Sequence, residues 1–287
     1  MTVADKSAFV VSPDWLQERL GQPGLSILDA SWYFPFLNRD AEGEYKTAHI
    51  PGAVFFDHEK LSDPESSLPH TLPKPEAFAA AVSSMGITNS DTIVVYDGPG
   101  MNTSPRVWWM LRVMGAKNVF VLDGGFDNWK KDGRPVTSGV TKIAPSAFIA
   151  DFQADKVASF ADMRTIVDAG SRQIADARAA GRFVGTDPEP RAGLRSGHMP
   201  GARNVPSSTL ADKGYLKDIA GLRQVLDDAG VDLSRPVVTS CGSGITAAVI
   251  TLALESLGHK DNILYDGSWS EWGAHKDTPV ATGEAEQ

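Results

Sequence analysis

The stretch "PVVTSCGSGITAA" (Pro236–Ala248) decides the fold, because it joins a short β-branched run to an apolar segment through a glycine-containing turn. Val237 to Thr239 is typical of a strand buried on both faces of a parallel sheet. The segment that follows, "AAVITLALESLG" (Ala247–Gly258), is apolar nearly all round and predicts a buried helix. Cys241, the one cysteine of the chain, falls in the turn between them.

The same signals recur in the first half of the chain, in the same order. The paired segments are "TIVVYDGPG" (Thr92–Gly100) with "PVVTSCGSG" (Pro236–Gly244), "AHIPGA" (Ala48–Ala53) with "GHMPGA" (Gly197–Ala202), and "DGGFDNW" (Asp123–Trp129) with "DGSWSEW" (Asp266–Trp272). Self-similarity of this kind indicates two copies of one domain. We expect an N-terminal domain over residues 1–138, a linker over 139–159 and a C-terminal domain over 160–287. Because strand-like and helix-like segments alternate, each domain is predicted to be α/β, a mostly parallel sheet flanked by helices.

Helical segments lie between the strand-like runs. "PEAFAAAVSSMG" (Pro75–Gly86) and "IAGLRQVLDDAG" (Ile219–Gly230) have helical apolar spacing and end in glycines suited to a left-handed cap. The tryptophan-rich "PRVWWMLRVMG" (Pro105–Gly115) has the same spacing, and we expect it in the core of the domain interface.

Composition excludes several classes of protein. The 287 residues carry a net charge of -9, which argues against a nucleic-acid or anionic-membrane surface. No apolar run approaches the ~20 residues of a membrane span, so a cytoplasmic protein is the default expectation. One cysteine forms neither an internal disulfide nor a multi-thiolate metal site, so Cys241 is either an inert core residue or a reactive thiol.

The turn around Cys241 favours a reactive thiol. Glycines let successive backbone amides point inward as an anion-binding nest, and a helix N-terminus adds partial positive charge, so both favour thiolate. The loop lacks the arginine of a cysteine phosphatase, since Ala247 stands at that position, and it lacks the lysine of a Walker loop. A thiol protease needs a histidine base, which sequence alone does not place near Cys241.

Together, "CGSGITAA", the paired "HIPGA" and "HMPGA" turns and "DGSWSEW" resemble the two-domain rhodanese superfamily, and within it the 3-mercaptopyruvate sulfurtransferase branch. The resemblance implies that Cys241 takes sulfur from a small-molecule donor as a persulfide and passes it to a thiol, thioredoxin or cyanide. No metal or organic cofactor is implied. The uncharged Gly242 and Ser243 favour mercaptopyruvate over thiosulfate, because the thiosulfate branch resembles a loop with basic residues there.

The resemblance also implies the site residues. Cys241 and Ser243 are expected to be catalytic, and Arg182 and Arg191 to hold the donor's carboxylate and carbonyl, since a guanidinium binds two oxygens at once. Without the resemblance, these arginines read as surface residues paired with Asp187 or Glu189. The persulfide is expected to rest on the loop residues Gly242, Gly244, Ile245 and Thr246.

Other polar residues have simpler expected roles. Asp97 stands where the second copy has Cys241, so the first copy is predicted to be inactive as a sulfur carrier. His49 and His198 occupy the same place in both copies, which favours a structural role in the turn; a weaker alternative, implied by the resemblance, joins Ser243 to His49 and Asp40 for proton transfer. Asp29 and Asp176 follow strand-like runs and are expected to be turn or cap residues.

Two rival functions remain open from the sequence. One is a thiosulfate sulfurtransferase. The other is a non-catalytic rhodanese-like module that binds a partner or senses oxidation through Cys241, for which an occluded cysteine would be the discriminating feature.

Overall fold

The computed structural model describes residues 5–285 and contains two five-stranded parallel sheets. The first sheet has the order β1-β5-β4-β2-β3, and the second has the order β6-β12-β11-β7-β8. The strands of the first sheet are β1 Val10–Val11, β2 Leu25–Asp29, β3 Ala53–Phe55, β4 Thr92–Tyr96 and β5 Val119–Leu122. Those of the second are β6 Val157–Ala158, β7 Gln173–Asp176, β8 Ala202–Asn204, β11 Val237–Ser240 and β12 Asn262–Tyr265. The matching strand orders confirm the predicted α/β duplication.

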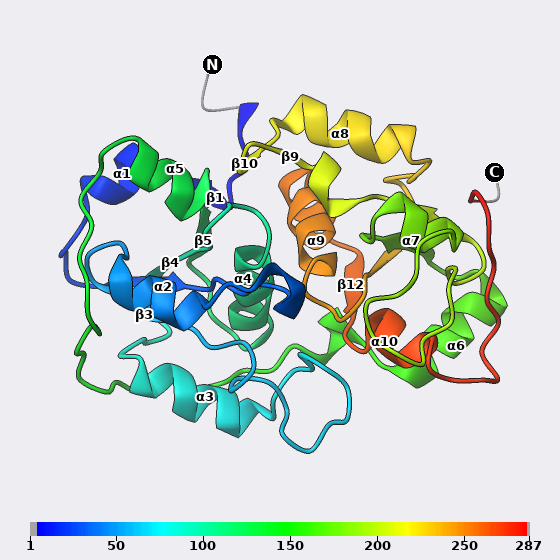
Figure 1. The fold of residues 1–287 in the computed structure, drawn as a ribbon, viewed down its shortest axis with the longest axis horizontal. Helices are drawn as coiled ribbons and strands as arrows, with labels where there is room; N and C mark the ends of the chain where they lie inside the picture. The colour runs from blue at the N-terminus through cyan, green and yellow to red at the C-terminus, as the bar shows by residue number, and fades with distance from the viewer. Residues whose placement is uncertain (1–4, 286–287) are drawn as a thin grey trace.

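Helices cover both faces of each sheet, as Figure 1 shows. The helices of the first half are α1 Pro13–Gln17, α2 Ala41–Thr47, α3 Pro75–Ser84, α4 Ser104–Val113 and α5 Gly125–Lys131, with the short 3-10 helix η2 Pro35–Leu37. Those of the second half are α6 Phe160–Ala169, α7 Ala180–Val184, α8 Ile219–Asp228, α9 Ala247–Ser256 and α10 Ser268–Trp272, with η3 Ala154–Lys156 and η4 Ser207–Thr209. Gly86 and Gly230 follow α3 and α8 with φ of 76° and 74°, which confirms both expected left-handed ends.

Alternation along the strands distributes the apolar side chains between separate cores. In β4, Ile93 and Val95 belong to one cluster while Val94 and Tyr96 belong to another, as the two-residue period of a strand requires. The cluster that holds Ile93 also contains buried residues of α4 and α9, one helix from each half. The two halves therefore share one continuous hydrophobic core.

The packing of α4 against α9 is the centre of the domain junction. Both helices lie between the two sheets in Figure 1. Trp108 and Leu111 of α4 and Ile250 and Leu252 of α9 are fully buried. The expectation that the tryptophan-rich segment forms interface core is confirmed, and Trp108 also donates from its indole nitrogen to the Val119 carbonyl at 3.1 Å.

The segment predicted as the linker ends inside the second sheet. Its last residues form η3 and β6, and β6 pairs with β12 in parallel register. A strand of two residues is too short to show a period in the sequence, which is why it was not foreseen. The predicted domain boundaries stay predictions, and residues 1–4 and 286–287 of those domains lie outside the described residues. Within residues 5–285, no helix has the length and apolarity needed to cross a membrane.

Candidate active site

Cys241 lies where β11 ends and the chain turns into α9, as the sequence predicted. The outward side of this turn is anchored by α10: Trp269 N donates to the Cys241 carbonyl at 2.9 Å, and Ser270 N donates to the Gly242 carbonyl at 2.8 Å. With these carbonyls bound on the outside, the amides that follow are free to face inward. Within the described chain, the amides of Gly244 and Thr246 have no protein acceptor.

The first copy shows what such amides bind. The carboxylate of Asp97, at the cysteine position, accepts hydrogen bonds from the amides of Gly100 at 2.6 Å, Asn102 at 3.0 Å, Thr103 at 2.8 Å and Ser104 at 2.7 Å. The outward anchoring is also repeated, since Phe126 N donates to the Asp97 carbonyl at 2.9 Å. The turn of this fold is thus an anion cradle, and the first copy fills its own cradle with a covalently attached anion.

Gly244 allows the same curvature in the second copy. Its φ is +81°, close to the +83° of Gly100, and a Cβ there would lie 2.9 Å from the Asp266 carbonyl oxygen. A side chain at this position would therefore meet both backbone strain and a collision. Gly244 shapes the loop but is not among the residues that line the cavity described next.

One cavity gathers most of the predicted site residues. It is lined by Trp32, Phe34, Asn102, Thr103, Arg182, Arg191, Cys241, Gly242, Ser243, Ile245 and Thr246. Trp32, Phe34, Asn102 and Thr103 come from the first half, so the first copy forms one wall of the cavity. The Cys241 side chain is buried, and the cavity beside it is small, with a volume of about 30 Å³.

The two arginines have different environments. Arg182 donates from Nη2 to Glu189 at 2.5 Å and lies so close to the loop that a Cβ on Gly242 would be 3.0 Å from this nitrogen. Glu189 is buried and also accepts from Arg178 at 2.9 Å, so Arg182 is held in place by a fixed carboxylate. The pairing with Glu189, expected of Arg182 without the family resemblance, is thus present at the edge of the cavity.

Arg191 is the cation left open toward Cys241. Among residues 5–285 its guanidinium has no hydrogen-bond or ion-pair partner, although it is partly buried. Burial lowers the pKa of Arg191, and a negative charge on Cys241 would oppose that shift. An anionic ligand in the cavity would supply the partner that Arg191 lacks.

A histidine from the first half reaches the cysteine loop. His70 Nδ1 lies 3.0 Å from Ser243 Oγ, and His70 Nε2 lies 3.1 Å from Glu59 Oε1. A carboxylate only accepts, so Nε2 carries the proton and Nδ1 is left to accept the Ser243 hydroxyl hydrogen. The Trp32 indole also donates to Glu59 at 2.9 Å, and its ring packs edge-on against His70 with centroids 4.7 Å apart.

This arrangement corrects the weaker alternative, because Ser243 meets His70 rather than His49. His49 Nδ1 is bonded to the Tyr45 carbonyl at 2.8 Å and Nε2 to Thr141 Oγ1 at 3.2 Å, which confirms its structural role. Asp40 caps α2 by accepting from Gly43 N at 3.0 Å.

The other expected structural residues also have local partners. His198 Nδ1 is bonded to the Phe183 carbonyl at 2.9 Å, which ties its turn to α7. Asp29 accepts from Ser31 N at 3.0 Å and Asp176 accepts from Arg178 N at 2.9 Å, as expected of turn residues. Asp176 additionally forms a buried ion pair with Arg178, which the sequence did not indicate.

Burial keeps His70 neutral. Desolvation lowers the pKa of His70, while the hydrogen bond and charge of Glu59 act to raise it and the cations Arg191 and Arg106 act to lower it. Burial raises the pKa of Glu59, but the hydrogen bonds from His70 and Trp32 outweigh this, so the pKa of Glu59 lies below its usual range. The neighbouring His58 is fully buried, which lowers its pKa to about 4. Near neutral pH, the His70–Glu59 pair thus consists of a neutral imidazole and an ionised carboxylate.

The geometry agrees with comparisons to known proteins. The model of the rhodanese-like domain matches residues 12–132 and again 159–275. The chain belongs to the rhodanese family. A relative from Escherichia coli (strain K12), described as 3-mercaptopyruvate sulfurtransferase, is 42% identical over 96% of this chain and 98% of its own length. A thiosulfate sulfurtransferase from Cricetulus griseus is also 42% identical, over 96% of each chain.

Solved structures of the rhodanese family share this architecture. The crystal structure of SseA from Escherichia coli, which is described among 3-mercaptopyruvate sulfotransferases, superposes with a TM-score of 0.85 at 41% identity, covering 92% of this chain and 99% of that one. These matches confirm the predicted resemblance to the 3-mercaptopyruvate sulfurtransferase branch and the expectation of an enzyme. Since relatives with two different donors in their names are equally identical, overall identity does not select the donor.

Replacement of Asp97 tests the anion cradle. Asp97→Ala leaves several buried amides without an acceptor, so we expect the free energy of unfolding to fall by at least about 3 kcal/mol in urea titrations. Asp40→Ala removes one exposed cap and should cost about 1 kcal/mol. Equal small losses for the two variants would contradict the cradle.

The pKa of His70 can be measured by NMR titration of its imidazole signals, assigned with His70→Ala. We expect a pKa below the ordinary value of about 6.5. Glu59→Gln removes the charge that favours the imidazolium and should lower this pKa further. Glu65→Gln, on the same loop but paired with Lys74, should leave it in place. An unchanged or higher pKa in Glu59→Gln would contradict the His70–Glu59 assignment.

Proposed function

We propose that this protein transfers sulfur from 3-mercaptopyruvate to a thiol acceptor through a persulfide on Cys241, releasing pyruvate. The observation that carries the proposal is that Cys241, Ser243 and the unpaired guanidinium of Arg191 line one cavity, and that Ser243 is hydrogen-bonded to His70 behind it. These groups supply a nucleophile, a carboxylate partner and a proton relay.

In the first step, the Cys241 thiolate attacks the donor's sulfur. A sulfur–sulfur bond forms and the carbon–sulfur bond breaks, with its electron pair passing to carbon as the enolate of pyruvate. The donor sulfur becomes the outer atom of the persulfide and gives up its hydrogen as a proton. That proton reaches the enolate carbon and completes pyruvate, so the step leaves a negatively charged persulfide and needs no external oxidant or reductant.

Ser243 is suited to pass that proton. Its hydroxyl bonds to the neutral His70, and His70 is oriented by the ionised Glu59, so a proton taken from or returned to Ser243 has a charge-compensated path. In hydroxyl–imidazole–carboxylate arrangements, the carboxylate orients the imidazole, and the imidazole acts as the base toward the hydroxyl. Arg191 and Arg182 flank the same cavity and suit the donor's carboxylate and ketone oxygens.

The cradle supports a persulfide product. In the first copy the equivalent amides hold the Asp97 carboxylate, so the amides of Gly244 and Thr246 are suited to a negative sulfur attached to Cys241. A thiol, such as that of thioredoxin, would then attack the outer sulfur and restore the Cys241 thiolate.

Two observations keep rival functions in view. The equal identity to a thiosulfate sulfurtransferase favours thiosulfate as an alternative donor, whereas the uncharged Gly242 and Ser243 favour the keto acid. Cys241 is only 2% exposed, which favours a binding or redox-sensing module with an occluded thiol.

Intact-mass spectrometry separates these functions. After incubation with 3-mercaptopyruvate, the protein should gain the mass of one sulfur atom, and Cys241→Ser should not. The added sulfur should disappear on addition of a thiol, with pyruvate formed in equal amount. A gain with thiosulfate but not mercaptopyruvate would reassign the donor, and no gain with either in folded protein would leave the non-catalytic module.

A further inference from the structure

Arg106 is a fully buried cation that joins the two halves beside the proposed site. It comes from α4 in the first half. Its Nη2 donates to the His70 carbonyl at 2.7 Å and to Asp266 Oδ1 at 2.6 Å, and its Nη1 donates to the Gly244 carbonyl at 3.3 Å. The guanidinium also lies 4.6 Å from the centre of the Trp109 ring.

These contacts lie on both sides of the His70–Ser243 hydrogen bond, on which the proposed proton relay depends. His70 and Ser243 belong to different halves, and their side chains are 3.0 Å apart. Arg106 binds the backbone of His70 itself and the backbone of Gly244, the residue directly after Ser243. One rigid, planar group therefore fixes the main chain on both sides of this hydrogen bond.

Asp266, the partner of Arg106, binds the His70 loop at a second point, two residues after His70. Its Oδ2 accepts from Leu72 N at 2.7 Å while its Oδ1 accepts from Arg106. The His70 loop is thus held at residues 70 and 72 by one ion pair between the buried Arg106 and the partly buried Asp266. Gly244 permits the close approach, because a Cβ there would lie 3.1 Å from Arg106 Nη1.

We propose that Arg106 is a positioning residue that sets the distance between His70 and Ser243, and so the proton transfer, across the domain junction. The proposal rests on the proposed function for its kinetic consequence. Its claim about geometry, that Arg106 maintains the His70–Ser243 hydrogen bond, does not depend on that function.

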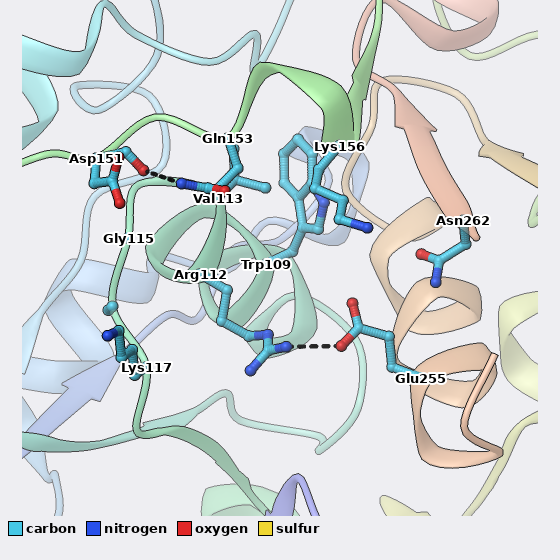
Figure 2. A pocket seen from close by; sticks show the side chains of 11 residues that line it. Trp109, Arg112, Val113, Gly115, Lys117, Asp151, Gln153, Lys156, Glu255 and Asn262 are labelled. Carbon is cyan, nitrogen blue, oxygen red and sulfur yellow. Dashed lines mark hydrogen bonds and ion pairs between the residues drawn. The ribbon is translucent and has the colours of Figure 1, made fainter. Parts of the chain in front are cut away.

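The chain supplies a matched control on the same helix. Arg112 of α4 also pairs with an acidic residue of the second half, Glu255 of α9, at 2.8 Å. Figure 2 shows this pair at a second pocket, lined by Trp109, Lys117 and Lys156 among others, with no residue in common with the Cys241 cavity. Arg112→Gln therefore removes an inter-domain arginine without touching the His70 loop.

Kinetics with 3-mercaptopyruvate tests the proposal. We expect Arg106→Gln to lower kcat by about 10- to 100-fold, as for a misplacement of about 1 Å, with KM changed by less than about 3-fold. In the His70→Ala background, the same substitution should lower kcat by less than about 3-fold, because the group it positions is gone. Arg112→Gln should keep kcat within about 2-fold of the wild type.

A second variant separates the loss of positioning from a loss of folding caused by an unpaired charge. Arg106→Gln leaves Asp266 without its cation, so Arg106→Gln with Asp266→Asn, which removes both charges, is measured beside it and should show the same loss of kcat. An undiminished kcat in a folded variant, equal losses with and without His70, or an equal loss in Arg112→Gln would each overturn the proposal.

The geometric claim has a readout that does not need turnover. The imidazole nitrogen signals of His70 should report loss of the Ser243 hydrogen bond in Arg106→Gln and its retention in Arg112→Gln. Unchanged signals in Arg106→Gln would overturn the positioning role even in an active enzyme. If the wild type took up no sulfur, the proposed function would fail while this measurement still decided the role of Arg106.

Discussion

The packing of α4 against α9 is the constraint on which the site depends. Each helix begins just after a strand-to-helix turn, one turn carrying Asp97 and the other Cys241, so burying the two helices in one core brings the two halves together around the cysteine loop. The first half then supplies Trp32 and Phe34 to the cavity that Cys241 lines, and its His70 binds Ser243 of the cysteine loop. The first copy, which has Asp97 in place of the cysteine, therefore helps to build the surroundings of Cys241.

At the domain junction, each half extends a loop that contacts the other half. The loop before α3 reaches into the second half, where Leu72 N donates to Asp266 at 2.7 Å. The hairpin of β9 (Ala211–Asp212) and β10 (Tyr215–Leu216) reaches into the first half, where Leu216 N donates to Asp123 at 2.8 Å. Asp123 and Asp266 open the paired "DGGFDNW" and "DGSWSEW" segments. Each aspartate thus accepts a hydrogen bond from a leucine amide of the opposite half, although the two loops that carry these leucines otherwise differ in sequence. Only the first loop carries a histidine to the opposite site.

The sequence predicted those features that are local. Glycines, a strand and a helix around Cys241 are set by short-range backbone physics, and self-comparison revealed the duplication and the Asp97 replacement. Arg182 and Arg191 came from the family resemblance, and the structure brings both to the cavity, with Arg182 paired to Glu189.

What the sequence did not reveal depends on contacts between the halves. His70 and Glu59 lie in a loop without regular periodicity, and no local rule places that loop on Ser243. One signal was available: "PHTL" (Pro69–Leu72) in the first copy stands where the second has "KGYL" (Lys213–Leu216), a difference of the same kind as that between Asp97 and Cys241. Arg106 was hidden for another reason, since an arginine on an apolar helix reads as an exposed residue until its buried partners are known.

The central claim is that groups from both halves act as one catalytic unit. The most direct test is a double-mutant cycle on the rate of Cys241 persulfide formation from 3-mercaptopyruvate, with His70→Ala, Ser243→Ala and the two combined. If the residues act as a unit, the double variant should be about as slow as the slower single variant. Losses that multiply would show that His70 and Ser243 act independently, and would contradict the account.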